Sequence, residues 1–70
     1  MNIDIRKSII NNFKNSSIDE IKESINDSIE KKDEITLPGM GVFFELLWEQ
    51  SNQEEQYIIL NNINNKLKNS

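Results

Sequence analysis

The chain contains no cysteine and no histidine, which removes two common ways of holding a small fold together. Disulfides need cysteine, and structural zinc sites are built mainly from cysteine and histidine. With 70 residues the chain forms one domain at most, and a chain of this size buries only about 60% of its unfolded surface. We therefore expect a single domain over residues 1–70, stabilised by tight helix packing or by self-association.

The missing histidine and cysteine also exclude much catalytic chemistry. Nucleophilic catalysis of the Ser-His-Asp or Cys-His kind needs an imidazole base. The paired carboxylates Asp19-Glu20, Asp33-Glu34 and Glu54-Glu55 remain, but two of the pairs fall in predicted first turns, where acidic side chains cap helices. No segment has the oxygen ligands and glycine of a calcium loop. We expect no enzyme activity, no cofactor, no metal and no small-molecule ligand.

Positive charge and long apolar runs are scarce as well. Twelve acidic and eight basic residues give a net charge of −4. Binding through phosphate neutralisation needs a basic surface, so the composition disfavours DNA binding, although a local basic patch remains an alternative. No run approaches 18 apolar residues, and residues 1–6 lack the pattern of a signal peptide. We expect an intracellular protein that makes no contact with membranes.

Isoleucine is abundant and recurs at helical spacing. Residues 3–14 are predicted to form a first helix, whose apolar face comprises Ile5, Ile9, Ile10 and Phe13. A second helix is predicted to begin at the capping box Ser17-Ile18-Asp19-Glu20. Its narrow apolar stripe comprises Ile18, Ile21, Ile25 and Ile29. A last helix is predicted over residues 52–68, after a capping box at 51–54, with a buried face of Ile59, Leu60, Ile63 and Leu67.

The only proline and both glycines lie within Leu37-Pro38-Gly39-Met40-Gly41. Proline fixes φ and glycine accepts positive φ, so the stretch predicts a turn, with Gly39 at positive φ and Gly41 either flexible or allowing close backbone approach. The preceding Ile35-Thr36-Leu37 is β-prone and predicts an extended entry or a short strand. The glycines lack the further residues of phosphate-binding loops, so we expect no phosphate site here.

Residues 40–48 are apolar except for Glu45. Such a segment is typical of a central helix covered by others, although a buried strand of about six residues has the same pattern. Helical spacing continues beyond it, which favours the helix. The sequence therefore predicts an all-α fold, a small bundle of three to four helices with a Leu-Pro-Gly-x-Gly turn before the central apolar helix.

Residues 37–48, Leu-Pro-Gly-Met-Gly-Val-Phe-Phe-Glu-Leu-Leu-Trp, resemble the central motif of the minor small acid-soluble spore proteins of the I type. The opening residues 1–7, the second helix, Glu54-Glu55 and the overall length are also similar to that family. The resemblance implies a non-enzymatic protein, made in the forespore and stored in the spore core. It transfers no functional residue. The positions we single out are structural: Leu37, Pro38, Gly39, Gly41, Phe44 and Trp48.

Two alternatives stay open. Residues 18–44 resemble, more weakly, the second helix and first strand of HU-type DNA-bending proteins. That resemblance implies a nucleic-acid-binding dimer with a strand near residues 35–37. The other alternative is a helical adaptor that buries Phe43 or Trp48 against a partner protein. For the leading hypothesis, a monomer and a homodimer are both compatible with the sequence.

Overall fold

The computed structural model describes residues 4–70, and in this part of the chain all regular structure is helical. The elements are α1 (Ile5–Phe13), α2 (Ile18–Lys31), the 3₁₀-helix η1 (Glu34–Thr36), α3 (Leu37–Gln50) and α4 (Gln53–Lys68). The predicted all-α class is confirmed, and the described residues form four α-helices where three to four were predicted. Ile3, the first residue of the predicted first helix, lies outside the described residues, as do Met1 and Asn2.

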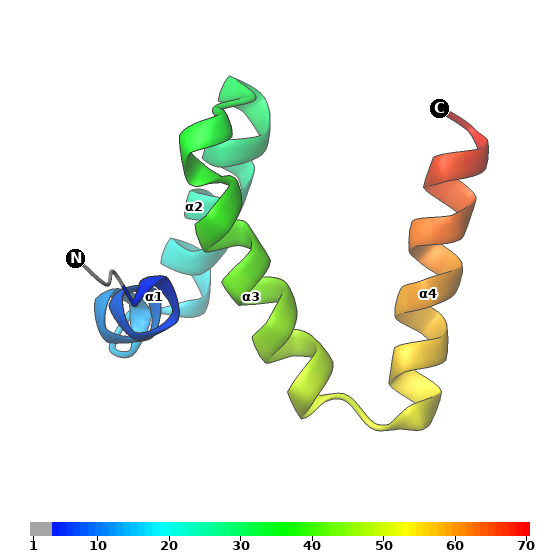
Figure 1. Ribbon diagram of the computed structural model, residues 1–70, viewed down its shortest axis with the longest axis horizontal. Helices are drawn as coiled ribbons and strands as arrows, with labels where there is room; N and C mark the ends of the chain where they lie inside the picture. The colour runs from blue at the N-terminus through cyan, green and yellow to red at the C-terminus, as the bar shows by residue number, and fades with distance from the viewer. Residues whose placement is uncertain (1–3) are drawn as a thin grey trace.

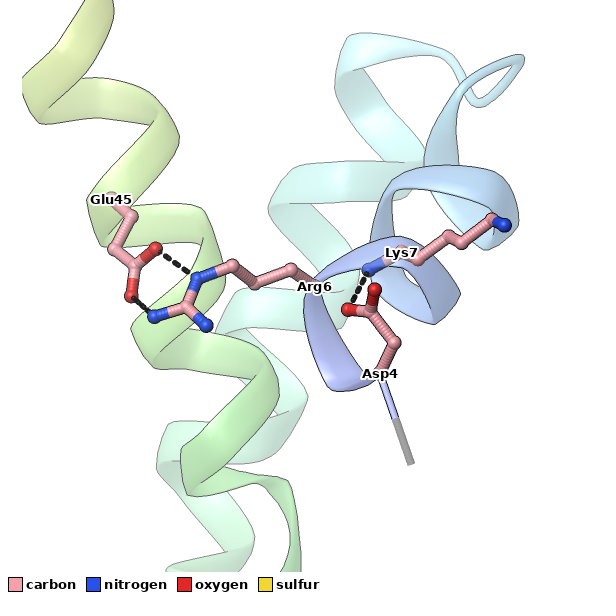
Figure 2. Close-up of polar contacts among 4 residues, drawn as sticks. All are labelled: Asp4, Arg6, Lys7 and Glu45. Carbon is pink, nitrogen blue, oxygen red and sulfur yellow. Dashed lines mark hydrogen bonds and ion pairs between the residues drawn. The ribbon is translucent and has the colours of Figure 1, made fainter. Parts of the chain in front are cut away.

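The first two helices begin where side chains cap them. The Asp4 carboxylate accepts a hydrogen bond of 3.0 Å from the Lys7 amide at the start of α1 (Figure 2). At α2 the predicted capping box is confirmed, because the Ser17 hydroxyl accepts from the Glu20 amide and the Glu20 carboxylate accepts from the Ser17 amide. These bonds satisfy amides that have no partner inside the helix.

The connection between α2 and α3 is a tight helical corner, so neither the extended entry nor the short strand considered for residues 35–37 forms. Lys32 ends α2 in the left-handed conformation at φ 49°. The Asp33 carboxylate then caps η1 through the Ile35 amide, and the Thr36 hydroxyl donates to the Asp33 carbonyl at 2.8 Å. These local hydrogen bonds offer the backbone an alternative to an extended conformation, which explains why the β-prone side chains do not form a strand.

The predicted turn at residues 37–41 is also wrong, because these residues form the first turns of α3. Neither glycine has positive φ. Pro38 lies in the first helical turn, where its missing N–H leaves no hydrogen bond unmade and its fixed φ suits the helix. The real turn comes earlier, at Lys32. The apolar helix thus begins at Leu37, three residues before the predicted start at Met40.

The last helix also begins with a capping box, one residue later than predicted. Asn52 is the N-cap: its side-chain oxygen accepts from the Glu55 amide at 2.8 Å, and the Glu55 carboxylate accepts from the Asn52 amide at 2.9 Å. Asparagine and serine are about equally favourable N-cap residues, so the helix could begin after either Ser51 or Asn52. Ser51 instead donates its hydroxyl to the Leu47 carbonyl at the end of α3.

Helix α3 organises the molecule (Figure 1). It contacts α1 and η1 extensively, whereas α4 extends on the far side of α3 and runs back in roughly the opposite direction. The radius of gyration is 13.6 Å, against about 11 Å for a compact domain of this length. Val42, at 5% exposure, is the one buried residue between residues 4 and 70. Helices α1 to α3 therefore form the packed part, and α4 adds little to the core.

Candidate interaction surface

The contact between α1 and α3 depends on the absence of a side chain at Gly39. A Cβ built at Gly39 would lie 3.1 Å from Cδ1 of Ile9, closer than most real contacts of this kind. Further along, the rings of Phe13 and Phe43 pack edge to face, with centroids 5.0 Å apart. The glycine thus lets α1 lie close to α3. No atom lies within 4 Å of the corresponding position at Gly41.

An ion pair on the surface bridges the same two helices (Figure 2). The Arg6 guanidinium on α1 donates two hydrogen bonds to the Glu45 carboxylate on α3, from Nε at 2.6 Å and from a terminal nitrogen at 2.7 Å. The planar fork of arginine matches a carboxylate in this bidentate way. The pair therefore fixes how α1 is rotated against α3, in addition to holding the helices together.

The pair shifts the titration of both groups. Hydrogen bonding from Arg6 lowers the pKa of the Glu45 carboxyl, with the positive charge of Arg6 acting in the same direction and desolvation opposing it. The hydrogen bonds to Glu45 in turn raise the pKa of Arg6. Both side chains are largely exposed to water, so solvent screening keeps the stabilisation small. The geometry is that of a structural contact, and neither group faces a closed cavity.

An apolar groove of 630 Å³ lies where α1, α2 and α3 meet. Its walls are formed by apolar residues with Lys14 at the edge: Ile9, Ile10, Phe13, Lys14, Ile21, Ile25, Met40, Phe43, Phe44, Leu46 and Leu47. The half-buried Ile21 and Ile25 come from the isoleucine stripe of α2, whereas Ile18 and Ile29, at its two ends, are exposed. Only the middle of the predicted stripe therefore contributes to packing.

A second apolar hollow separates α3 from α4. It is lined by Phe44, Glu45, Trp48, Glu49 and Leu60. The rings of Phe44 and Trp48 stack, with centroids 6.0 Å apart and planes inclined by 29°. The Gln56 side-chain amide of α4 donates to the Trp48 carbonyl of α3 at 3.1 Å. This side of α3 is therefore apolar and only partly covered.

The apolar face of α4 differs most from prediction. Leu60, Ile63 and Leu67 are all exposed and Ile59 is only half-buried, so the expectation that these residues form a buried face is wrong for the isolated chain. The spacing correctly marks one side of the helix, and α3 faces this side at Leu60 across the hollow, but within residues 4–70 most of it stays uncovered. We call Ile59, Leu60, Ile63 and Leu67 the α4 stripe.

All six positions singled out from the sequence lie on α3, but they do not form one site. Leu37 and Gly41 are exposed, Gly39 meets Ile9, and Pro38 sets the first turn. Phe44 and Trp48 stack beside the hollow that faces α4. The sequence reasoning missed the Arg6–Glu45 pair. Glu45 itself was the signal, because it is the only charged residue in the apolar stretch 40–48, and a carboxylate in such surroundings needs a partner.

Polar side chains build no metal-binding cluster within residues 4–70. No three acidic groups there lie together in a way that could hold a metal ion. The hydrogen bonds of the side chains serve helix ends, the α1–α3 pair and the junction of α3 with α4. None of the helices in residues 4–70 is long and apolar enough to span a membrane. The main surface feature of residues 4–70 is therefore an apolar area to which α2, α3 and α4 contribute.

Comparison with known proteins places the chain in a family. The family described as "Small, acid-soluble spore protein I" matches residues 3–67. Proteins of that name from Bacillus cytotoxicus and Bacillus mycoides are 33% and 32% identical, over 99% and 97% of this chain and 99% of each relative. A third, from Geobacillus kaustophilus, is 29% identical over 97% of this chain. No solved structure matches the chain significantly.

The match covers the described elements from α1 to nearly the end of α4, including the whole of α3 with its Leu-Pro-Gly-x-Gly start. The resemblance stated from residues 37–48 is thereby confirmed. Sporulation is the process in which this family acts, and its members are associated with spores. The chain belongs to the small, acid-soluble spore protein I family.

Proposed function

We propose that this protein is a non-enzymatic component of the spore core, made in the forespore, that acts through contacts of its apolar surface. The observation that carries the proposal is that polar and apolar side chains have different roles in this structure. The described polar groups cap helices or hold α1 and α4 to α3, whereas a large apolar area on α3 and α4 has no partner within residues 4–70. Exposed apolar patches of this size mark interaction surfaces.

The surface chemistry supports contact with protein over contact with DNA. The hollow beside Phe44 and Trp48 is lined by two carboxylates, Glu45, which is paired with Arg6, and Glu49. Neither carboxylate attracts phosphate, and the net charge of −4 gives no compensating attraction. The aromatic side chains are thus presented in a setting suited to packing against apolar side chains.

A fluorescent fusion expressed from the natural promoter tests the proposed time and place of action. Signal that appears late in sporulation, inside the forespore only, and stays in the core fraction of purified spores is the expected result. Fluorescence in vegetative cells, or recovery from the spore coat fraction, would contradict the proposal. A promoter already established as vegetative, driving the same reporter, controls for leakage between compartments.

A further inference from the structure

We propose that the exposed α4 stripe pairs with the α4 stripe of a second copy of this chain, antiparallel and about a twofold axis. This inference rests on the proposed function, since it names the partner that the apolar surface contacts. The stripe residues recur at spacings of three and four along α4, which places them on one side of the helix as in helix–helix interfaces.

The amount of exposed surface fits a missing partner. The chain has an accessible surface of 6407 Å², whereas a compact monomer of this length exposes about 4500 Å². The excess exceeds the roughly 800 Å² that each partner buries in a stable interface of standard size. The large radius of gyration has the same origin, because α4 stands away from the packed helices (Figure 1).

The junction between α3 and α4 is short, and within residues 4–70 it leaves this surface largely uncovered. Only Ser51 and Asn52 separate the two helices, and both are held by hydrogen bonds. The Ser51 hydroxyl donates to the Leu47 carbonyl at 2.6 Å, and Asn52 caps α4. Gln56 fastens the first turn of α4 to the Trp48 carbonyl. Of these bonds, only the one from Gln56 to the Trp48 carbonyl joins the two helices, and moving α4 closer to α3 would disturb it. A second copy can contact the stripe while this bond stays in place.

The charge pattern of α4 selects an antiparallel copy. Residues 56–65 carry no charge, the acidic Glu54 and Glu55 lie in the first turn, and the basic Lys66 and Lys68 lie in the last. Glu55 and Lys66 are eleven residues apart, about three helical turns, and so flank the stripe on the same side. In an antiparallel pair each Glu55 comes opposite Lys66 of the second copy, twice by symmetry. A parallel pair would bring like charges together.

The same register makes the apolar contacts self-complementary. With Glu55 opposite Lys66 of the second copy, the twofold axis crosses α4 near residues 60 and 61. Leu60 then lies beside the axis, close to Leu60 of the other copy, and Ile63 lies within about 3 Å, measured along the helix, of the level of that Leu60. This arrangement is the isologous interface expected of a closed dimer, in which one patch contacts itself. Antiparallel helix dipoles also place the negative end of each helix beside the positive end of its neighbour.

Sedimentation of the full chain tests the pairing, with two matched variants. Leu60, on the stripe, and Ile58, on the opposite side of α4, are similarly exposed at 51% and 55%. We expect twice the chain mass for the wild type and for Ile58→Glu, and dimerisation at least about tenfold weaker for Leu60→Glu, because a charge would be buried in an apolar contact. A wild-type chain that remains monomeric at concentrations on the order of 100 micromolar would overturn the proposal. Equal weakening of dimerisation in both variants would overturn it as well.

Cross-linking tests the direction of the pair, and the absence of native cysteine makes it unambiguous. An equimolar mixture of Gln53→Cys and Leu67→Cys chains is expected to form the mixed disulfide, while each variant alone forms little. Efficient cross-linking of Leu67→Cys to itself would show a parallel pair and refute the antiparallel one. Circular dichroism of every variant checks that α4 still forms. A monomeric result would leave the forespore reporter experiment untouched, so the two proposals fail separately.

Discussion

Gly39 lies where α1 crosses α3, and the reason for a glycine there is space. Its backbone is an ordinary right-handed helix, in which glycine costs about 1 kcal/mol relative to alanine. A larger residue at this position would crowd the nearby Ile9 side chain, which explains why glycine occurs here despite that cost. At Glu45 the local sequence is again unfavourable, a charge in an apolar helix, and Arg6 compensates for it from another helix. The role of each residue is therefore explained by a contact with a residue far away in the sequence.

Gly39→Val is expected to destabilise the fold by about 1–3 kcal/mol, because a branched side chain must push α1 away from α3. Gly41→Val is the matched control, since nothing lies within 4 Å of its added Cβ; its effect should stay within about 1 kcal/mol. Urea unfolding followed by circular dichroism measures both. Equal destabilisation of the two variants would show that the α1–α3 contact does not depend on Gly39.

The Arg6–Glu45 pair predicts a small, pH-dependent stabilisation. Because the pKa of Glu45 is lowered in the folded chain, the stabilisation is complete above the ordinary glutamate pKa of about 4.3 and disappears as pH falls through the lower, folded value. Thermal unfolding of wild type and Glu45→Gln should therefore differ at pH 7 and converge near pH 3. Glu49→Gln, one turn further along α3, serves as the control. A difference that persists in strong acid would contradict this origin.

At the scale of the element, local signals located most helix ends. The capping box of α2 and the existence of all four helices were predictable because capping side chains and helical periodicity act within a few residues. The start of α3 was mispredicted for a physical reason. Proline and glycine suit a turn, but proline also suits the first turn of a helix. Only the hydrogen bonds of Asp33 and the left-handed Lys32 reveal that the chain has already turned.

Lys32 is the one described non-glycine residue with positive φ, a conformation that costs an L-residue about 1–2 kcal/mol. Lys32→Gly is expected to stabilise the chain by roughly 1 kcal/mol, since glycine is the preferred residue after a helix end. Lys31→Gly, inside the last turn of α2, should instead destabilise by a similar amount and also remove the ion pair with Asp27. Thermal denaturation of both variants would distinguish a glycine-specific gain at position 32 from a general effect of lost charge.

For the whole molecule, the exposed apolar surface and the acidic charge decide what it contacts. Helices α1 to α3 enclose little more than Val42, so the stability of an isolated chain is limited and a partner adds to it. The HU-like alternative required a strand and a basic arm. The corner at residues 33–36 is helical, and the hollow beside α3 is lined by carboxylates.

We expect no saturable binding of this protein to duplex DNA in a gel-shift titration, even at low salt, because too few cations are available to displace counterions. A basic DNA-bending protein run in parallel supplies the positive control. Saturable binding that weakens steeply with added salt would instead support the nucleic-acid alternative. The assay should use the full chain at concentrations where its oligomeric state has been measured.

The sequence by itself determined the helices, the family and the exclusion of histidine- and cysteine-based chemistry, because these follow from residue types and short spacings. It also marked which side of each helix is apolar. Only the tertiary structure decided which of those sides are covered. Gly39 and Ile9, or Arg6 and Glu45, meet across about 30 to 40 residues of chain, and the α4 stripe stays largely exposed although its Leu60 lines the hollow that faces α3. These contacts depend on how the helices pack against one another. The periodicity within one helix shows which side is apolar, but it does not show which other helix covers that side.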